Sequence, residues 1–189
     1  MLVQVREFSF KMTYFEELKK SMDYLSNKQD TIFIGQAVEY AGTAMTNTLI
    51  DVQSEKLMEF PVCEEFQMGT SIGMAMNGFV PISIYPRWNF LVLSLNQILN
   101  HLDKIIDISN GGYNPKVIIR TSVGSERPLH PQDQHVGDFS DAFRLMLKNI
   151  EVIQLKEPED IYASYKKAYE REDGKSTILV EYGDFYNEK

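Results

Sequence analysis

Short apolar runs alternate along this chain with longer stretches of helical periodicity. Six runs of four to six residues are rich in β-branched and aliphatic side chains. Nearly continuous apolar runs of this length are typical of strands that are covered on both faces of a sheet. The pattern therefore predicts six strands, at residues 31–35, 57–60, 82–85, 116–121, 151–155 and 177–182.

Five helices are predicted between these strands, at residues 13–25, 66–77, 89–108, 138–148 and 158–171. Thr13 and Glu16 have the spacing of a capping box at the first helix. Strands that alternate with helices favour a doubly wound α/β fold. We expect a mostly parallel six-stranded sheet with helices on both faces. Residues 1–189 would form one domain, with residues 1–11 as an N-terminal extension.

The predicted helix at residues 89–108 carries two apolar stripes at helical spacing. Two stripes indicate a helix that is covered on more than one side. Either both stripes pack into the core of this domain, or one of them contacts another subunit. The stripes are Leu91, Leu95, Ile98, Leu102 and Ile105, and Val92, Leu99 and Ile106.

The composition narrows the class of protein. The 189 residues include 19 Lys and Arg against 27 Asp and Glu, a net charge of −8, so a nucleic-acid partner is not expected. The chain has no apolar run long enough to span a membrane and no signal-peptide pattern at its start, so we expect no membrane association. The single cysteine, Cys63, excludes an internal disulfide and fits a cytoplasmic protein.

Two segments carry candidate chemistry. Glu64 and Glu65 follow a predicted strand, and ligands of open α/β sheets bind beyond the carboxyl ends of strands. One of these carboxylates is an acid/base candidate, although acidic residues also favour the first turn of a helix for structural reasons. The long polar loop at residues 122–137 contains His130 and His135, which are either functional or simply solvated. We expect no metal site in this chain, which also lacks dinucleotide-binding and P-loop motifs.

An ordered set of segments over nearly the whole chain resembles one enzyme family. The resemblance is to the pyrimidine-binding domain of thiamine-diphosphate enzymes, in particular the β subunit of 2-oxoacid dehydrogenase decarboxylase components and transketolases. It begins near Met12 and implies the same doubly wound α/β fold. The segments are MTYFEELKKSM, TIFIGQAVEYAG, EFPVCEEFQMGTSIGMAMNGFVPISIYPRWNF, LNQILNHLDKI, NPKVIIRTSVG and STILVEYGDFY.

The resemblance also implies roles for five residues. Glu64, in the family's Pro-apolar-small-Glu pattern, would hydrogen-bond the cofactor's aminopyrimidine and promote its imino tautomer. Phe90 would stack on that ring, and Val62 would lie beside it. His135 would be the active-site loop histidine, with His130 as a competitor. Gln36 stands where the family usually has a Glu that connects paired active sites.

Two departures from the family point to a partner. The family's C-terminal domain and its Gly-Asp-Gly…Asn motif, which holds Mg²⁺ and the diphosphate, are missing from this sequence. An α-type subunit that carries this motif would complete the site, as an α2β2 heterotetramer acting on a 2-oxoacid or ketose. We expect two-carbon transfer or 2-oxoacid decarboxylation and carboligation. The alternatives are a β-like subunit of a 2-oxoacid dehydrogenase complex, a non-catalytic regulatory paralogue and an unrelated α/β binding domain.

Overall fold

The six predicted strands form one sheet in the order β2-β1-β3-β4-β6-β5. The computed structural model describes residues 12–40, 43–127 and 130–187, so the expected extension at residues 1–11 lies outside them. Every neighbouring pair of strands is parallel, which confirms the predicted α/β class and makes the sheet wholly parallel. The strands are β1 (Thr31–Gly35), β2 (Leu57–Glu59), β3 (Val80–Ile84), β4 (Ile118–Val123), β5 (Ile150–Gln154) and β6 (Ser176–Tyr182).

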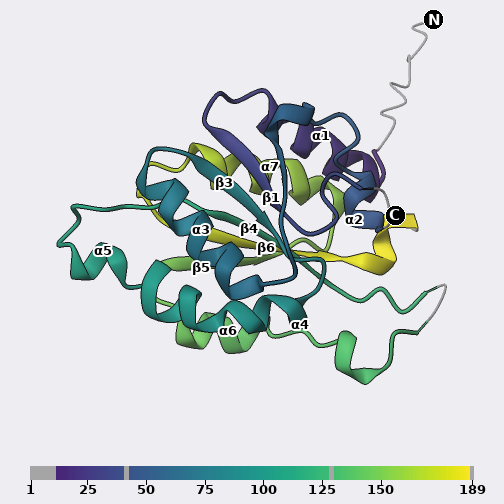
Figure 1. Ribbon diagram of the computed structural model, residues 1–189. Coiled ribbons are helices and arrows are strands. Elements are labelled where there is room, and N and C mark those ends of the chain that lie inside the picture. Colours follow the sequence, from purple (N-terminus) through teal and green to yellow (C-terminus); the bar gives the residue numbers. More distant parts are fainter. Residues whose placement is uncertain (1–11, 41–42, 128–129, 188–189) are drawn as a thin grey trace, which may run out of the picture.

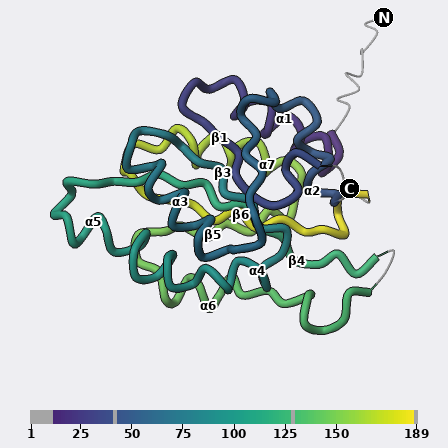
Figure 2. Tube along the Cα trace, viewed as in Figure 1, coloured from purple at the N-terminus to yellow at the C-terminus, as the bar shows by residue number. Residues whose placement is uncertain are grey.

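Helices cover both faces of this sheet, as predicted (Figure 1). One core lies between the sheet and the neighbouring helices α1 and α7, which run side by side in Figures 1 and 2. A second core on the opposite face includes side chains of α3, α4 and α6. The helices are α1 (Tyr14–Ser26), α2 (Ala44–Asn47), α3 (Glu64–Met76), α4 (Trp88–Leu91), α5 (Ile105–Ile108), α6 (Ser140–Met146) and α7 (Pro158–Glu170).

The first helix begins at the predicted capping box. The backbone N–H of Glu16 donates to Thr13 Oγ1 at 3.3 Å, and the N–H of Thr13 donates to Glu16 Oε2 at 2.8 Å. Two N–H groups that the helix itself leaves unbonded are thereby satisfied. No helix in the described ranges is long and apolar enough to cross a membrane.

The segment predicted as a helix at residues 89–108 is helical, but it is not one regular α-helix. It runs from α4 through the 3₁₀ turn η2 (Val92–Ser94) and the π-helical η3 (Gln97–Leu102), and after a turn at Asp103 and Lys104 it ends in α5. Asp103, directly after η3, is fully buried. Its carboxylate accepts the N–H groups of Lys148 and Asn149 at 2.9 and 2.7 Å, which ties the segment to the turn before β5.

The two apolar stripes of this segment differ in burial. Of the first stripe, Leu91, Ile98 and Leu102 are buried in the core, whereas the second stripe is only partly buried throughout. The first stripe therefore packs mainly inside the domain. Val92 and Leu99 of the second stripe pack against the same core but keep some exposed surface that another subunit could contact.

A buried ion pair joins the central strands β4 and β6. Arg120 and Glu181 are both fully buried, and Arg120 Nε and Nη2 donate to the Glu181 carboxylate, the latter at 3.0 Å. The hydroxyls of Tyr165 on α7 and Tyr186 after β6 donate to the same carboxylate. Burial and the charge of Glu181 raise the pKa of both tyrosines well above the ordinary value, so both remain donors.

Removal of one partner from this pair should destabilise the fold more than removal of both. Arg120→Met leaves Glu181 buried without its counter-ion and should lower the free energy of unfolding by about 3–5 kcal/mol. The double variant Arg120→Met/Glu181→Gln removes both charges and should recover part of this loss. Urea unfolding followed by circular dichroism measures both values. A double variant that is less stable than the single one would contradict this account of the pair.

Candidate functional site

The loops that follow neighbouring strands meet at one edge of the sheet, because the strands are parallel. Gln36 directly follows β1, and Glu64 begins α3 shortly after β2. Phe90 lies on α4 after β3, and His135 ends the short turn η4 (Asp133–His135) in the loop after β4. Residues that are far apart in the sequence therefore gather at the edge where open α/β sheets bind ligands.

Glu64 and Gln36 form the first pair at this edge. Glu64 is 7% exposed, and its Oε1 accepts a hydrogen bond from Gln36 Nε2 at 3.4 Å. The hydroxyl of Tyr85, at the end of β3, donates to the backbone carbonyl of Glu64 at 3.3 Å and holds the first turn of α3. The bond from Gln36 is long, so the carboxylate retains acceptor capacity for a further donor.

The loop that carries Gln36 is held by a residue that sequence reasoning missed. The carboxylate of Glu59, the last residue of β2, accepts the backbone N–H groups of Ala37, Val38 and Glu39 at 2.7, 2.9 and 3.0 Å. Ala37 has a φ of +53°, a conformation that these contacts help to hold. No sequence signal marks Glu59, because its partners lie about twenty residues earlier and are backbone groups.

Phe90 and His135 form the second pair. Their ring centroids lie 5.6 Å apart with an interplanar angle of 49°. Arg87 fixes the histidine loop, because its Nη1 donates to the backbone carbonyl of His135 at 3.0 Å. Nδ1 of His135 is buried and has no hydrogen-bond partner within the part of the chain that the structure describes. A buried ring nitrogen without a partner, beside an aromatic face, can form a hydrogen bond with a bound group, either as donor or as acceptor.

The other two candidates lie in different surroundings. His130 has an exposed side chain, and its Nε2 lies 3.8 Å from the carboxylate of Glu126 on the same loop. Val62, between β2 and α3, is 80% exposed. Of the two loop histidines, the structure therefore brings His135, and not His130, into contact with Phe90.

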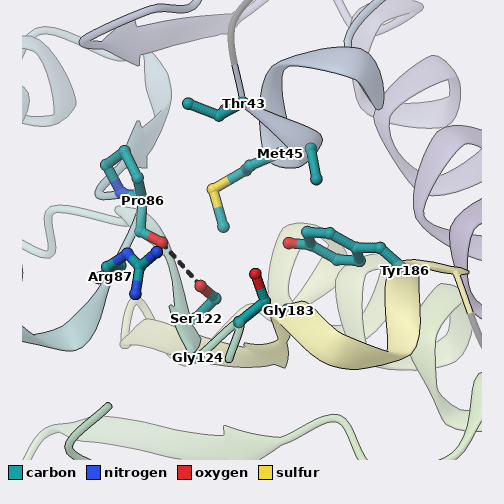
Figure 3. Close-up of a pocket in the computed structure, with 10 residues that line it drawn as sticks. Thr43, Met45, Pro86, Arg87, Ser122, Gly124, Gly183 and Tyr186 are labelled. Atoms are coloured by element: carbon teal, nitrogen blue, oxygen red, sulfur yellow. Dashed lines mark hydrogen bonds between the residues drawn. The ribbon is translucent and has the colours of Figure 1, made fainter. Parts of the chain in front are cut away.

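A cavity of about 100 Å³ lies beside these residues at the same edge of the sheet. Figure 3 shows its labelled side chains arranged around a common space, with Thr43 and Met45 opposite Ser122 and Gly124. Tyr186 connects the cavity to the buried ion pair, because its hydroxyl donates to Glu181. The side chains that define it are Thr43, Met45, Pro86, Arg87, Ser122 and Tyr186.

Arg87 supplies the positive charge of this cavity. Burial lowers the pKa of its guanidinium below the ordinary value, and the charge of Asp184 opposes this effect. No three His, Cys, Asp or Glu side chains within residues 12–40, 43–127 and 130–187 come close enough to hold a metal ion. The polar groups at this edge of the sheet are thus a carboxylate, an amide, an imidazole and a guanidinium, and of these the guanidinium lines the cavity.

Comparisons with known families and sequences identify what this chain is similar to. The family described as "Transketolase, pyrimidine binding domain" matches residues 11–186. The pyruvate dehydrogenase E1 component subunit beta of Cyanidium caldarium is 30% identical over 122 residues, which cover 62% of this chain and 37% of that protein. The subunit of the same name from Gracilaria tenuistipitata var. liui is 25% identical over 180 residues, 93% of this chain and 54% of that protein. The chain therefore spans about half or less of the length of these relatives.

A solved structure has the same fold. It is described as "Split gene transketolase, inactive beta4 tetramer", and it superimposes with a TM-score of 0.68 over 92% of this chain and 52% of its own. At 14% identity this likeness concerns the fold alone.

The contacts of Glu59 predict its contribution to stability. Glu59→Gln keeps one acceptor oxygen but loses the charge that three N–H groups share, so the free energy of unfolding should fall by about 1–3 kcal/mol. Urea unfolding measures this value. Glu55→Gln is the matched control, because Glu55 is exposed on the adjacent turn, and it should change stability by less than about 0.5 kcal/mol. Equal effects of the two substitutions would contradict the role assigned to Glu59.

Proposed function

The chain belongs to the transketolase pyrimidine-binding-domain family, and from this membership we propose that it is the β-type subunit of a split thiamine-diphosphate enzyme. It would act as one pyrimidine-binding domain that binds the aminopyrimidine end of the cofactor. The observation that carries the proposal is the buried carboxylate of Glu64 at the edge of the sheet to which the loop of Phe90 also leads.

The residues at this edge fit an aminopyrimidine. Glu64 is almost completely buried, yet its carboxylate accepts a single hydrogen bond from the described residues, at 3.4 Å from Gln36. A protonated ring nitrogen that donates a hydrogen bond to this carboxylate would satisfy it. Phe90 offers a face for offset stacking, a geometry that aromatic pairs prefer. When bound, thiamine diphosphate supplies a carbon nucleophile that attacks the carbonyl of a substrate.

The side chains of this domain would then have distinct tasks. Glu64 holds the proton at a ring nitrogen, and its burial keeps water away from that bond. Gln36 donates to Glu64 and fixes its orientation. The neutral amide of Gln36 carries no proton between paired sites, so the site would lack the carboxylate link that the family usually has at this position. His135, with its unpaired Nδ1, contacts the substrate.

Exposed apolar side chains beside the site support a partner subunit. Val62, Phe66 and Leu93 are 80, 60 and 61% exposed, and they lie before α3, on α3 and on η2. On the side of α3 that Gly73 occupies, no other element of the described chain lies within 4 Å of where a side chain would begin. This side of α3 is therefore open to close approach by another chain. This surface would contact an α-type subunit that holds Mg²⁺ and the diphosphate, in an α2β2 assembly.

The reaction would make or cleave a carbon–carbon bond next to a carbonyl. Two-carbon transfer between sugars and 2-oxoacid decarboxylation with carboligation both fit this description. The relatives named as pyruvate dehydrogenase subunits support a 2-oxoacid as one of these two candidate substrate classes. A non-catalytic paralogue would have no need to bury Glu64 beside Gln36, and the pair therefore favours an enzyme.

Glu64→Gln provides the central test. The chain is mixed with a separately encoded α-type subunit, thiamine diphosphate and Mg²⁺, and turnover is assayed with pyruvate and with a ketose donor. Glu64→Gln should lower turnover by about 10²–10⁴-fold, because it removes the group that holds the proton. Circular dichroism should show an unchanged fold.

Glu65→Gln is the control for this test, because the exposed carboxylate of Glu65 contacts only Asn96 and Gln97 among the described residues. It should leave turnover within about threefold of the parent, as is usual for surface substitutions. Equal losses for the two variants, or no turnover of either donor by the parent mixture, would contradict the proposed function.

The loop histidines can be separated in the same assay. His135→Ala should lower kcat/KM by about tenfold or more, because His135 lies beside Phe90 and would contact the substrate. His130→Ala should change kcat/KM by less than about twofold, since its side chain is exposed beside Glu126. The opposite order of effects would assign the substrate contact to His130.

A further inference from the structure

Arg87 brings a positive charge into the cavity at the edge of the sheet without a carboxylate to neutralise it. The acidic group whose charge acts on its guanidinium is Asp184. Asp184 is engaged elsewhere, since its carboxylate accepts the backbone N–H groups of Glu126 at 3.1 Å and of Arg127 at 3.2 Å. In the described residues Arg87 has no ion pair, and its one hydrogen bond uses Nη1.

Four hydroxyl groups line the cavity, and those of Ser122, Thr43 and Tyr186 already have partners. Ser122 donates to the carbonyl of Pro86 at 2.7 Å, and Thr43 shares a 2.7 Å hydrogen bond with the hydroxyl of Thr46. Tyr186 donates to Glu181 beneath the cavity. The side-chain donors in the cavity that have no partner among the described residues are therefore the remaining N–H groups of the Arg87 guanidinium and the hydroxyl of Ser125. Of these, only the guanidinium carries a charge.

The size of the cavity limits what can enter it. At about 100 Å³ it has room for a group of the size of a carboxylate or a phosphate. Both anions match the planar donor arrangement of a guanidinium.

We propose that Arg87 and this cavity bind the anionic group of the substrate, a carboxylate or a phosphate, and thereby select anionic over neutral substrates. The location suits this role, because Arg87 also holds the loop of His135 beside Phe90. An anion on Arg87 would anchor one end of the substrate next to the imidazole. The assignment of the anion to a substrate rests on the proposed function, whereas anion binding itself does not.

The test uses the full chain alone, so that it is independent of turnover. Amide chemical shifts are followed by two-dimensional NMR during titration with acetate, inorganic phosphate or neutral acetamide at constant ionic strength. Saturable shifts at Arg87, Ser125 and Gly183 are expected with one or both anions and not with acetamide. The net charge of −8 disfavours general anion binding, so a saturable response reports a local site. The tighter of the two anions identifies the substrate's anionic group as a carboxylate or a phosphate.

Variants separate Arg87 from other sources of a response. Arg87→Gln should lower the affinity for the anion at least about tenfold, which is the loss expected when a charged hydrogen bond is removed. Arg144→Gln is the matched control, because it removes the same charge from α6, where Arg144 pairs with Asp141 at 2.7 Å, and it should bind as the parent does. Arg87→Lys keeps the charge without the planar fork and should give intermediate affinity. If Arg87→Gln does not fold, the affinity of Arg87→Lys still tests whether Arg87 binds the anion.

The outcomes distinguish the two proposals. A response that grows linearly with every salt, or one that persists in Arg87→Gln, would overturn the anion site. Saturable binding that is lost in Arg87→Gln supports the anion site even if Glu64→Gln keeps full turnover, a result that would refute only the proposed function. In the active mixture, Arg87→Gln should raise KM for the anionic substrate at least about tenfold with a smaller change in kcat.

Discussion

The buried ion pair between Arg120 and Glu181 is the interaction on which the arrangement at the functional edge depends. Burial of two charges costs several kcal/mol per ion, and only good geometry and further hydrogen bonds offset this. Here Arg120 donates two hydrogen bonds to the Glu181 carboxylate, and two tyrosine hydroxyls donate to the same carboxylate. A shift of β4 against β6 would separate the charges, so the pair fixes one register for the centre of the sheet. Tyr186, which takes part in this network, also lines the cavity.

Parallel pairing then determines which residues meet. Each strand delivers its following loop to the same edge, and successive loops contribute Gln36, Glu64, Arg87 and His135. Side chains hold these loops to the rigid sheet by bonds to backbone groups. Glu59 accepts three N–H groups of the loop after β1, and Arg87 donates to the carbonyl of His135. The site thus gains its order from contacts between loops rather than from regular secondary structure.

The sequence was sufficient to predict the sheet, because continuous apolar runs are demanded by strands buried on both faces. It was also sufficient for α1, whose capping box is a local signal. Periodicity located the helical segment at residues 89–108, but it did not reveal the 3₁₀ and π-helical turns within it or the turn at Asp103, whose carboxylate accepts N–H groups from a part of the chain far away in the sequence. For the site, family resemblance pointed to Glu64 and Phe90. It pointed to neither Glu59 nor Arg87, whose partners are backbone atoms far away in the chain.

The exposure of the residues around Glu64 is uneven, and this has a consequence for the proposed chemistry. Glu64 is 7% exposed, whereas Val62, two residues earlier, is 80% exposed and Phe66, two residues later, is 60% exposed. The chain itself therefore shields the carboxylate but leaves the apolar rim around it in water. Proton transfer in a dry pocket requires that this rim be covered as well. On the proposed function, a partner that buries Val62 and Phe66 would stabilise the assembly and at the same time exclude water from the site, which would couple assembly to activity.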